Sequence, residues 1–207
     1  MELFGPFCGT TNRNLYPASR LTVPVNDSDL LRRMLAGDED SFTTLYRQRQ
    51  AAVYRFALQM TGSAAVAEDV TQEVFMALIE HGKRFDPSRG TLASFLYGVA
   101  RNMVLRRLEK ERVTESIEDR AGDLDLLEDL TRRETIEQVR RAVLSLPPVY
   151  REAVVLCDLQ DVSYQDAAVA LDCPVGTVRS RLNRGRSMLA QKLGMAAAPA
   201  AAAEGAV

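Results

Sequence analysis

Apolar residues recur at helical spacing along most of this chain, in runs that Gly, Pro, Ser and Asp residues separate. The clearest example is a pair of stripes near the C-terminus, formed by Tyr164, Ala167, Ala168 and Leu171 and then by Val178, Leu182, Gly185 and Leu189. Ser163 is a suitable N-cap for the first stripe. Between the stripes, Asp172 tolerates a left-handed backbone, and Pro174 favours the start of a new helix. The pattern predicts two short helices around a tight turn.

Similar stripes predict the other helices, over residues 29–36, 39–60, 64–80, 91–112, 131–144 and 149–157. Residues 81–90, rich in Gly, Pro, Asp and Ser, are predicted to form a loop. We therefore predict an all-α fold with two small helical domains, residues 27–112 and 131–194. A flexible acidic linker, residues 113–130, joins them. Residues 1–26 are expected to form a flexible leader, and the Ala-rich residues 195–207 a disordered tail.

Charge is nearly balanced over the whole chain, with 26 basic and 28 acidic residues, but it is unevenly distributed. The second helix of the C-terminal pair lies in a stretch, residues 173–203, that contains no acid. Its bases are Arg179, Arg181, Arg184, Arg186 and Lys192. A basic second helix after a tight turn is typical of a helix-turn-helix whose recognition helix enters the DNA major groove. An exposed basic helix without a ligand is the alternative.

Acidic residues are concentrated around the predicted linker, since residues 109–138 contain eleven acids and five bases. Few large apolar residues occur there before Leu124, so this segment cannot bury a core of its own. An acidic linker could imitate nucleic acid inside a basic channel, and a plain solvated tether explains the composition equally well.

The candidate chemistry is binding rather than catalysis. The three cysteines are far apart, there is one histidine, and no phosphate-binding loop or nucleophile beside a histidine base is present. We therefore expect no enzyme activity, no cofactor and no metal. The N-terminus lacks the charged and apolar segments of a signal peptide, and no run is long enough to span a bilayer, so we expect the chain to stay in the cytoplasm.

Five motifs in order together resemble the extracytoplasmic-function (ECF) group of the sigma-70 family, which directs bacterial RNA polymerase to promoters. They are DxxQEVF at residues 69–75, SFLYGVARN at 94–102, LPPVYREAV at 146–154, SYQDAA at 163–168 and PVGTVRSRL at 174–182. The resemblance covers roughly residues 27–193. It implies that the two domains are sigma regions 2 and 4. The chain departs from the family at Asp172-Cys173, where Gly and an aliphatic residue are usual.

The resemblance also implies the partners, which are core RNA polymerase through its β′ clamp and β subunit, promoter DNA, and an anti-sigma factor. The polymerase-binding residues would be Asp69, Gln72, Glu73 and Phe75. Asp69, Gln72 and Glu73 share one helix face at i, i+3, i+4, and the corresponding polymerase surface is basic in the family. Without the resemblance, an ordinary solvated face would explain these residues.

Promoter contacts are likewise implied in two groups. The residues expected at the −10 element are Asp86, Ser88, Arg89, Tyr97, Arg101, Asn102 and Arg106. Those expected at the −35 element are Tyr164, Gln165, Gly176, Thr177, Arg179, Ser180, Arg181, Asn183, Arg184 and Arg186. Arg179 and Arg184 are predicted to contact base edges, and Arg181 and Arg186 to contact phosphates. A stand-alone helix-turn-helix regulator is the alternative function, and an all-helical enzyme is a more remote one.

Overall fold

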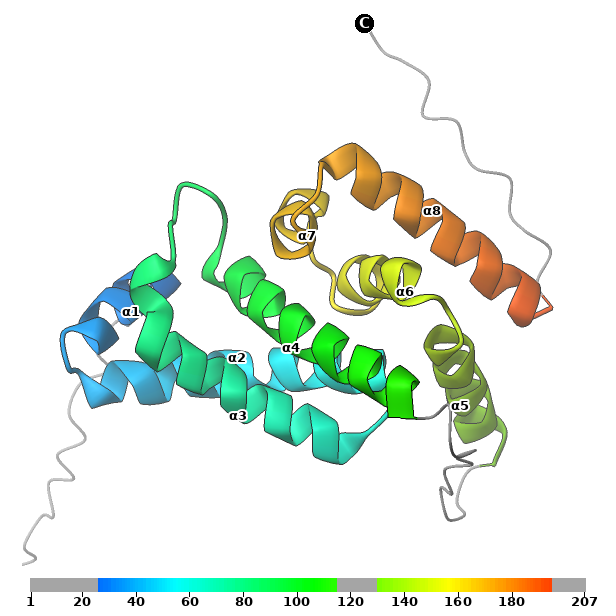
Figure 1. Ribbon diagram of the computed structural model, residues 1–207, viewed down its shortest axis with the longest axis horizontal. Coiled ribbons are helices and arrows are strands. Elements are labelled where there is room, and N and C mark those ends of the chain that lie inside the picture. The colour runs from blue at the N-terminus through cyan, green and yellow to red at the C-terminus, as the bar shows by residue number, and fades with distance from the viewer. Residues whose placement is uncertain (1–25, 115–129, 195–207) are drawn as a thin grey trace, which may run out of the picture.

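The computed structural model describes residues 26–114 and 130–194, and these residues form helices and turns without a strand. The N-terminal half contains α1 (Asp27–Leu35), α2 (Glu39–Thr61), α3 (Ala64–His81), the short 3-10 turn η1 (Gly82–Arg84) and α4 (Leu92–Thr114). The C-terminal half contains α5 (Leu130–Leu144), α6 (Pro148–Val154), the wide π-helical turn η2 (Val155–Leu159), α7 (Tyr164–Leu171) and α8 (Val175–Lys192). The predicted all-α fold is confirmed (Figure 1).

The expected leader and tail lie outside the described residues, apart from Asn26, which caps α1. The predicted linker lies outside them at residues 115–129, whereas Thr114 belongs to α4 and Leu130 to α5. The two helices therefore reach slightly further toward each other than the sequence pattern indicated.

Capping groups set most of the helix ends. The side chains of Ser63 and Ser163 accept hydrogen bonds from the amides of Val66 (3.3 Å) and Asp166 (3.1 Å), as the sequence predicted. Asp172 ends α7 in the left-handed conformation, with φ 49°, which explains how the turn forms without the usual glycine. Asn26 caps α1 through the Ser28 amide, so this helix begins two residues earlier than predicted.

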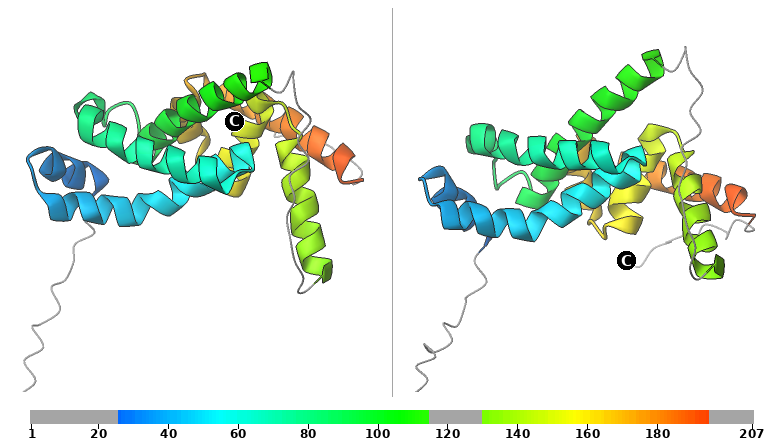
Figure 2. Two further views of the ribbon diagram at one scale, coloured as in Figure 1. Left: turned by 60° about the horizontal axis from the view of Figure 1, so that its bottom comes forward. Right: turned by 90° about the horizontal axis from the view of Figure 1, so that it is seen from below.

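The two halves are in direct contact, and their buried apolar residues form one continuous core. Helix α4 packs against α2 and α3 on one side and against α7 on the other (Figures 1 and 2). Gly98 of α4 allows the approach, because a Cβ there would lie 3.5 Å from the Ala170 carbonyl oxygen of α7. The sequence pattern, which treated the domains separately, gave no indication of this contact.

Contact on two sides changes which residues of α4 are buried. The apolar spacing within residues 91–112 predicts a core stripe of Leu92, Phe95, Leu96, Val99 and Met103. The structure instead buries Leu92, Leu96, Tyr97, Ala100 and Val104, and leaves Phe95, Val99 and Met103 half-buried. The predicted stripe is therefore wrong in part, because a helix enclosed by two layers has no single apolar face.

The predicted helix over residues 149–157 is also divided. Helix α6 ends at Val154, and the chain continues through the wider turn η2, which contains Cys157. Cys157 and Cys173 are free and half-buried. Burial and the neighbouring Asp158 raise the pKa of the Cys157 thiol to about 11, so this sulfur stays protonated and unreactive at neutral pH.

Candidate nucleic-acid interface

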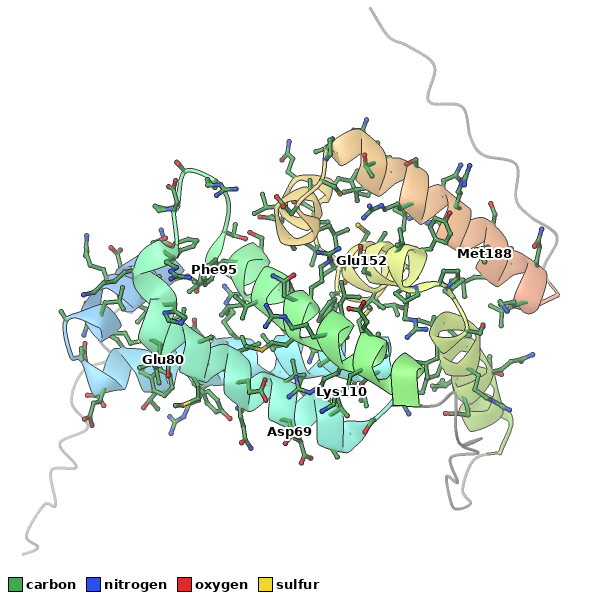
Figure 3. All side chains as sticks on the ribbon, viewed as in Figure 1. Asp69, Glu80, Phe95, Lys110, Glu152 and Met188 are labelled. Carbon is green, nitrogen blue, oxygen red and sulfur yellow. The ribbon has the colours of Figure 1, made fainter. Side chains whose placement is uncertain are left out.

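The outer face of α3 is exposed and carries acidic, amide and apolar side chains together. Asp69, Gln72 and Glu73 are exposed there, as their spacing predicted. Met76 and Ile79 continue the same face one to two turns further, with exposures of 56% and 46%. Asp69 points away from the other helices (Figure 3). Helical spacing gave no indication that these two apolar residues are exposed, and their exposure makes the face suitable for protein contact.

Phe75 does not belong to this exposed face. Only 3% of it is exposed, and its ring packs edge-on against Tyr46, with a centroid distance of 4.8 Å. The Phe42 ring completes the cluster, 6.5 Å from Phe75 and 6.1 Å from Tyr46. The structure therefore places Phe75 in the core behind the acidic face, which contradicts direct contact between its side chain and a partner.

The loop before α4 exposes the first group of predicted DNA contacts. Asp86, Ser88 and Arg89 are all exposed. The Asp86 carboxylate accepts hydrogen bonds from the Ser88 amide (2.9 Å) and hydroxyl (2.7 Å), and these bonds lower the pKa of Asp86. The loop conformation is thus fixed by its own side chains, and Arg89 remains exposed beside it.

The predicted DNA contacts on α4 have three different environments. Asn102 and Arg106 are exposed, as expected for DNA contacts. Tyr97 is only 6% exposed and packs edge-on against Phe56 at 5.5 Å, so burial raises its pKa. Arg101 is held by Glu152 of α6. The side chain of Tyr97, which is expected at the −10 element, is therefore not open to a DNA strand in this conformation.

The helix-turn-helix of α7 and α8 has the predicted buried stripe. Val178, Leu182 and Gly185 are buried in α8, and a Cβ at Gly185 would lie 2.6 Å from a Val154 methyl group, so only glycine fits there. The opposite side of α8 exposes Gly176, Arg179, Ser180, Asn183 and Arg184, while Thr177 is half-buried. From α7, Tyr164 and Gln165 are exposed beside this surface. The Arg179 guanidinium lies over the Tyr164 ring, 5.7 Å from its centroid.

Two arginines of α8 that were predicted to contact phosphates are already paired. Arg181 is half-buried and donates to the Glu152 carboxylate at 3.1 Å. Arg186 makes a bidentate pair with Asp158 of η2, at 2.6 Å and 3.0 Å, which raises the pKa of the guanidinium. Their phosphate contacts would require these carboxylates to be exchanged for DNA.

Glu152 is the functional candidate that sequence reasoning missed. It lies on α6 (Figure 3) and is 1% exposed, and it binds Arg101 from the N-terminal half and Arg181 from α8. Beside it, Arg151 donates to the carbonyls of Leu146 and of Met60, the latter near the end of α2. An acid in the LPPVYREAV motif would ordinarily be assigned to solvent, since only its two partners from distant segments show why it is buried.

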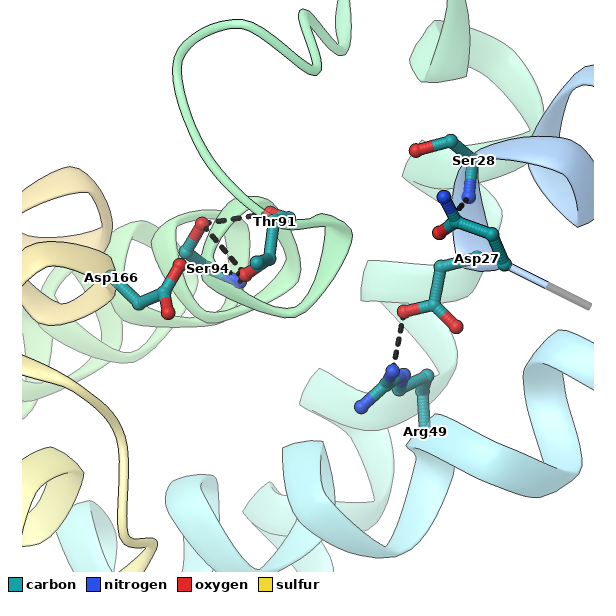
Figure 4. Close-up of polar contacts among 7 residues, drawn as sticks. Asp27, Ser28, Arg49, Thr91, Ser94 and Asp166 are labelled. Atoms are coloured by element: carbon teal, nitrogen blue, oxygen red, sulfur yellow. Dashed lines mark hydrogen bonds and ion pairs between the residues drawn. The ribbon is translucent and has the colours of Figure 1, made fainter. Parts of the chain in front are cut away.

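A smaller set of polar contacts joins the loop before α4 to α7. The Thr91 hydroxyl caps the Ser94 amide at 3.2 Å and donates to Asp166 of α7 at 2.8 Å (Figure 4). On the opposite wall, Arg49 pairs with Asp27. These residues line an open polar cleft between α1, α4 and α7. Within the described ranges, no cluster of His, Cys, Asp or Glu could hold a metal ion, and no helix could cross a membrane.

Comparison with known proteins connects these surfaces with a family. The Sigma-70 region 2 model matches residues 45–114, and the Sigma-70, region 4 model matches residues 136–189. The ECF RNA polymerase sigma factor SigM of Mycobacterium tuberculosis is 31% identical over 171 residues, which are 82% of this chain and 85% of SigM. The ECF RNA polymerase sigma-E factor of Escherichia coli is 31% identical over 189 residues, covering 82% of this chain and 95% of that protein.

A solved structure has the same fold. The sigma factor RpoE in complex with the anti-sigma factor NepR from Bartonella quintana matches with a TM-score of 0.61 and 23% identity, over 74% of this chain and 96% of RpoE. The family models cover α2 to α4 and α5 to α8, the same helices that carry the acidic and basic faces described above. The chain therefore belongs to the sigma-70 family and, within it, to the ECF sigma factors.

Proposed function

We propose that this protein directs core RNA polymerase to promoters through three surfaces on its two sigma regions, residues 27–112 (region 2) and 131–194 (region 4). The observation that supports this most strongly is the division of exposed charge. Acids lie on α3, and unpaired basic and polar residues lie on α8 opposite its buried stripe. A polymerase subunit that also binds DNA needs an acidic face for a basic polymerase surface and a basic face for DNA.

The outer face of α3 binds core polymerase in this proposal. Asp69, Gln72 and Glu73 supply charge and hydrogen bonds toward the basic surface of the β′ clamp, and Met76 and Ile79 supply apolar area. Phe75 supports the face from behind. The β subunit is a second polymerase contact, which the family resemblance implies for region 4.

The −10 element is contacted by the loop and by the exposed side of α4. Opening duplex DNA costs a few kcal/mol per unstacked step. A flipped base held in a protein pocket recovers about 1–3 kcal/mol where it stacks on an aromatic ring. Asp86, Ser88, Arg89, Asn102 and Arg106 are available for the unpaired strand in the described conformation, and polymerase contacts supply the remaining free energy.

The −35 element is contacted by α8, with its N-terminal half in the major groove. Arg179 and Arg184 each have a guanidinium that can bind guanine O6 and N7 in a bidentate manner. Ser180 and Asn183 lie on the same exposed side. Tyr164, Gln165, Gly176 and Thr177 approach the phosphates around the turn.

The chain acts by binding and makes no covalent bond itself, in keeping with a family of transcription initiation factors. It acts in the cytoplasm, because core polymerase and chromosomal promoters are there. We extend to this chain an anti-sigma partner as well, since RpoE of Bartonella quintana was solved in complex with the anti-sigma factor NepR.

Run-off transcription with purified core polymerase tests the function. The chain with core enzyme alone should produce transcripts that start at one position on promoter-containing DNA and are absent from a template with a scrambled −35 or −10 element. A stand-alone helix-turn-helix regulator would bind DNA without polymerase and give no transcript with core enzyme. That second result would overturn the proposal.

A further inference from the structure

Arg179 differs from the other arginines of α8 in the kind of partner that holds it. Its guanidinium lies over the ring of Tyr164 from α7, 5.7 Å from the ring centroid. The other three each donate a hydrogen bond, Arg181 and Arg186 to carboxylates and Arg184 to a tyrosine hydroxyl. An aromatic ring attracts a cation through its π face without occupying the in-plane N–H donors of a guanidinium. No protein group among the described residues occupies the donors of Arg179, so they remain available to a base.

The Tyr164 ring is placed by the start of α7 and by a second arginine. Tyr164 is the first residue of that helix, which the side chain of Ser163 caps with a hydrogen bond of 3.1 Å. Asp158, and to a smaller extent Tyr164, raise the pKa of Arg186, so the tyrosine also lies beside this ion pair. Arg179 and Arg186 are about two helical turns apart and therefore lie on the same side of α8. Tyr164 thus lies next to both arginines.

Packing of the core does not account for the position of this ring. The apolar spacing assigned Tyr164 to the buried stripe of α7, together with Ala167 and Leu171. The structure buries those two residues but leaves Tyr164 38% exposed and outside the apolar core. The assignment of Tyr164 to the stripe is therefore wrong, because its ring faces Arg179 of α8 rather than the core.

We infer that Tyr164 is a positioning residue for −35 recognition, whose ring holds the Arg179 guanidinium at the base edges of the major groove. Tyr164 then determines specificity at one base pair through Arg179, in addition to any contact of its own hydroxyl with a phosphate. The inference rests on the proposed function, in which α8 reads the −35 element. The holding of Arg179 can be measured without polymerase or DNA, so the two can fail separately.

A held guanidinium discriminates better between bases than a mobile one. Guanine offers O6 and N7 as a pair of acceptors, and only a guanidinium in the correct orientation binds both. An arginine that moves freely loses side-chain freedom when it binds, and it can also turn to a phosphate, which carries no sequence information. A contact between a cation and an exposed ring changes an equilibrium constant by about two- to fivefold. This factor is the share of discrimination that we assign to Tyr164.

The first measurement is the order parameter of the Nε–H group of each arginine, from ¹⁵N relaxation of the free full-length chain. Arg179 should be more ordered than Arg184, whose hydrogen bond to Tyr150 is long at 3.4 Å. Tyr164→Leu removes the ring and should lower the order parameter of Arg179 to that of Arg184, whereas Tyr164→Phe keeps the ring and should preserve it. Tyr150→Phe is the matched control, because it removes only the bond to Arg184 and should not affect Arg179.

The second measurement is the binding of holoenzyme to a series of promoters with single-base substitutions in the −35 element. Arg179→Ala identifies the base pair at which this arginine discriminates. Tyr164→Leu should reduce discrimination at that base pair alone by about two- to fivefold. Tyr164→Phe should keep that discrimination, with at most an equal loss of affinity for every sequence.

A double substitution tests whether the effect passes through Arg179. In a chain that already carries Arg179→Ala, Tyr164→Leu should cause no further loss of discrimination, since the side chain that it positions is gone. A residue that only stabilised α7 would lower the affinity for every base variant, with or without Arg179. Thermal unfolding monitors whether each variant keeps its fold.

Equal losses on every base variant in folded Tyr164→Leu would overturn the inference. So would an order parameter of Arg179 that does not respond to Tyr164→Leu, or additive effects of the two substitutions. A loss of discrimination in Tyr164→Phe as large as in Tyr164→Leu would assign the effect to the hydroxyl and refute the role of the ring. A holoenzyme without any promoter preference would refute the proposed function and with it the role in −35 recognition, whereas the order parameters decide separately whether Tyr164 holds Arg179.

Discussion

Helices α3 and α4 are neighbours in region 2, and they differ in how many of their faces are covered. Helix α3 packs against α2 and α4 and leaves its outer face, with Asp69, Gln72 and Met76, open to a partner. Helix α4 has α2 and α3 on one side and α7 on the other. Tyr97 is buried against Phe56 of α2, and Arg101 is held by Glu152 of α6. The proposed polymerase surface is thus exposed, while part of the proposed DNA surface is covered.

The same contrast occurs within α8. Arg184 is exposed and makes only a long hydrogen bond of 3.4 Å to the Tyr150 hydroxyl, whereas Arg181 is held by the buried Glu152. An exposed arginine can contact a base without losing a partner. A paired one must first exchange its carboxylate, so its effect on binding includes the strength of the pair. Arg184 can therefore contact a base directly, whereas Arg181 must first leave Glu152.

The largest expected effect is on the free energy of unfolding, and it distinguishes the buried side of α3 from its exposed side. Phe75→Ala should lower the free energy of unfolding by about 3–5 kcal/mol, because it removes a buried ring. Met76→Ala, at the exposed neighbouring position, should change it by less than about 0.5 kcal/mol. Urea unfolding measures both. Equal effects of the two substitutions would show that Phe75 is not in the core.

The next effect concerns the open face alone. Asp69→Arg with Glu73→Arg should weaken core-polymerase affinity by at least about tenfold, since like charges facing each other across an interface cost several kcal/mol. The free energy of unfolding should change little, because the Glu73–Arg107 pair that is lost lies at the surface. Fluorescence anisotropy with core enzyme provides the measurement, and Asp40→Arg on α2 is a matched exposed control. Normal affinity in the folded double variant would refute the role of this face.

A smaller effect tests recognition by α8. Arg184→Ala should remove about 1–3 kcal/mol of discrimination at one or two −35 base pairs, because a bidentate contact to guanine is lost. Arg186→Ala should weaken binding to all sequences about equally. It should also reduce the slope of log affinity against log salt concentration by roughly one released counterion. A series of single-base substitutions at two salt concentrations, measured with holoenzyme, distinguishes these results. Equal losses for Arg184→Ala on every base variant would place the base contacts elsewhere.

The smallest effect tests α4. Asn102→Ala should slow promoter opening by roughly two- to tenfold, the value of one hydrogen bond, and should spare closed-complex binding. Tyr97→Phe keeps the buried ring and should not change the opening rate, because its side chain faces Phe56 rather than the surface. Permanganate footprints over time give the rates. A larger effect for Tyr97→Phe than for Asn102→Ala would contradict the assignment of the −10 contact to Asn102 rather than to Tyr97.

Much of the fold follows from local sequence signals. The spacing of Val178, Leu182 and Gly185 gave the buried side of α8, and Ser63 and Ser163 gave two helix starts. These predictions succeeded because each depends on neighbours within a few residues. The open residues of the candidate site, such as Asn102 and Arg184, follow from the same spacing, since the side opposite a buried stripe is exposed.

The remaining features depend on contacts between distant segments. Tyr97 was expected to contact the −10 element from the surface of α4, but it is buried. A helix that packs on two sides buries residues outside a single apolar stripe. Glu152 carries no sequence signal of burial, since its partners lie 51 and 29 residues away. Arg181 and Arg186 have the spacing of phosphate contacts, and only the fold shows that Glu152 and Asp158 hold them. Periodicity identifies faces, but it does not identify what covers them.

Disulfide trapping across the contact of α7 with the loop before α4 tests most directly whether polymerase uncovers the DNA surface. A Cβ at Gly90 would lie 3.1 Å from a Val169 methyl carbon, close enough for cysteines at 90 and 169 to bridge after small shifts. The measurement follows the rate of disulfide formation in a chain carrying Gly90→Cys and Val169→Cys, with the native cysteines replaced by alanine. Our account predicts rapid formation in the free protein and strong suppression by core polymerase. Slow formation in the free protein, or an equal rate with core polymerase bound, would contradict it.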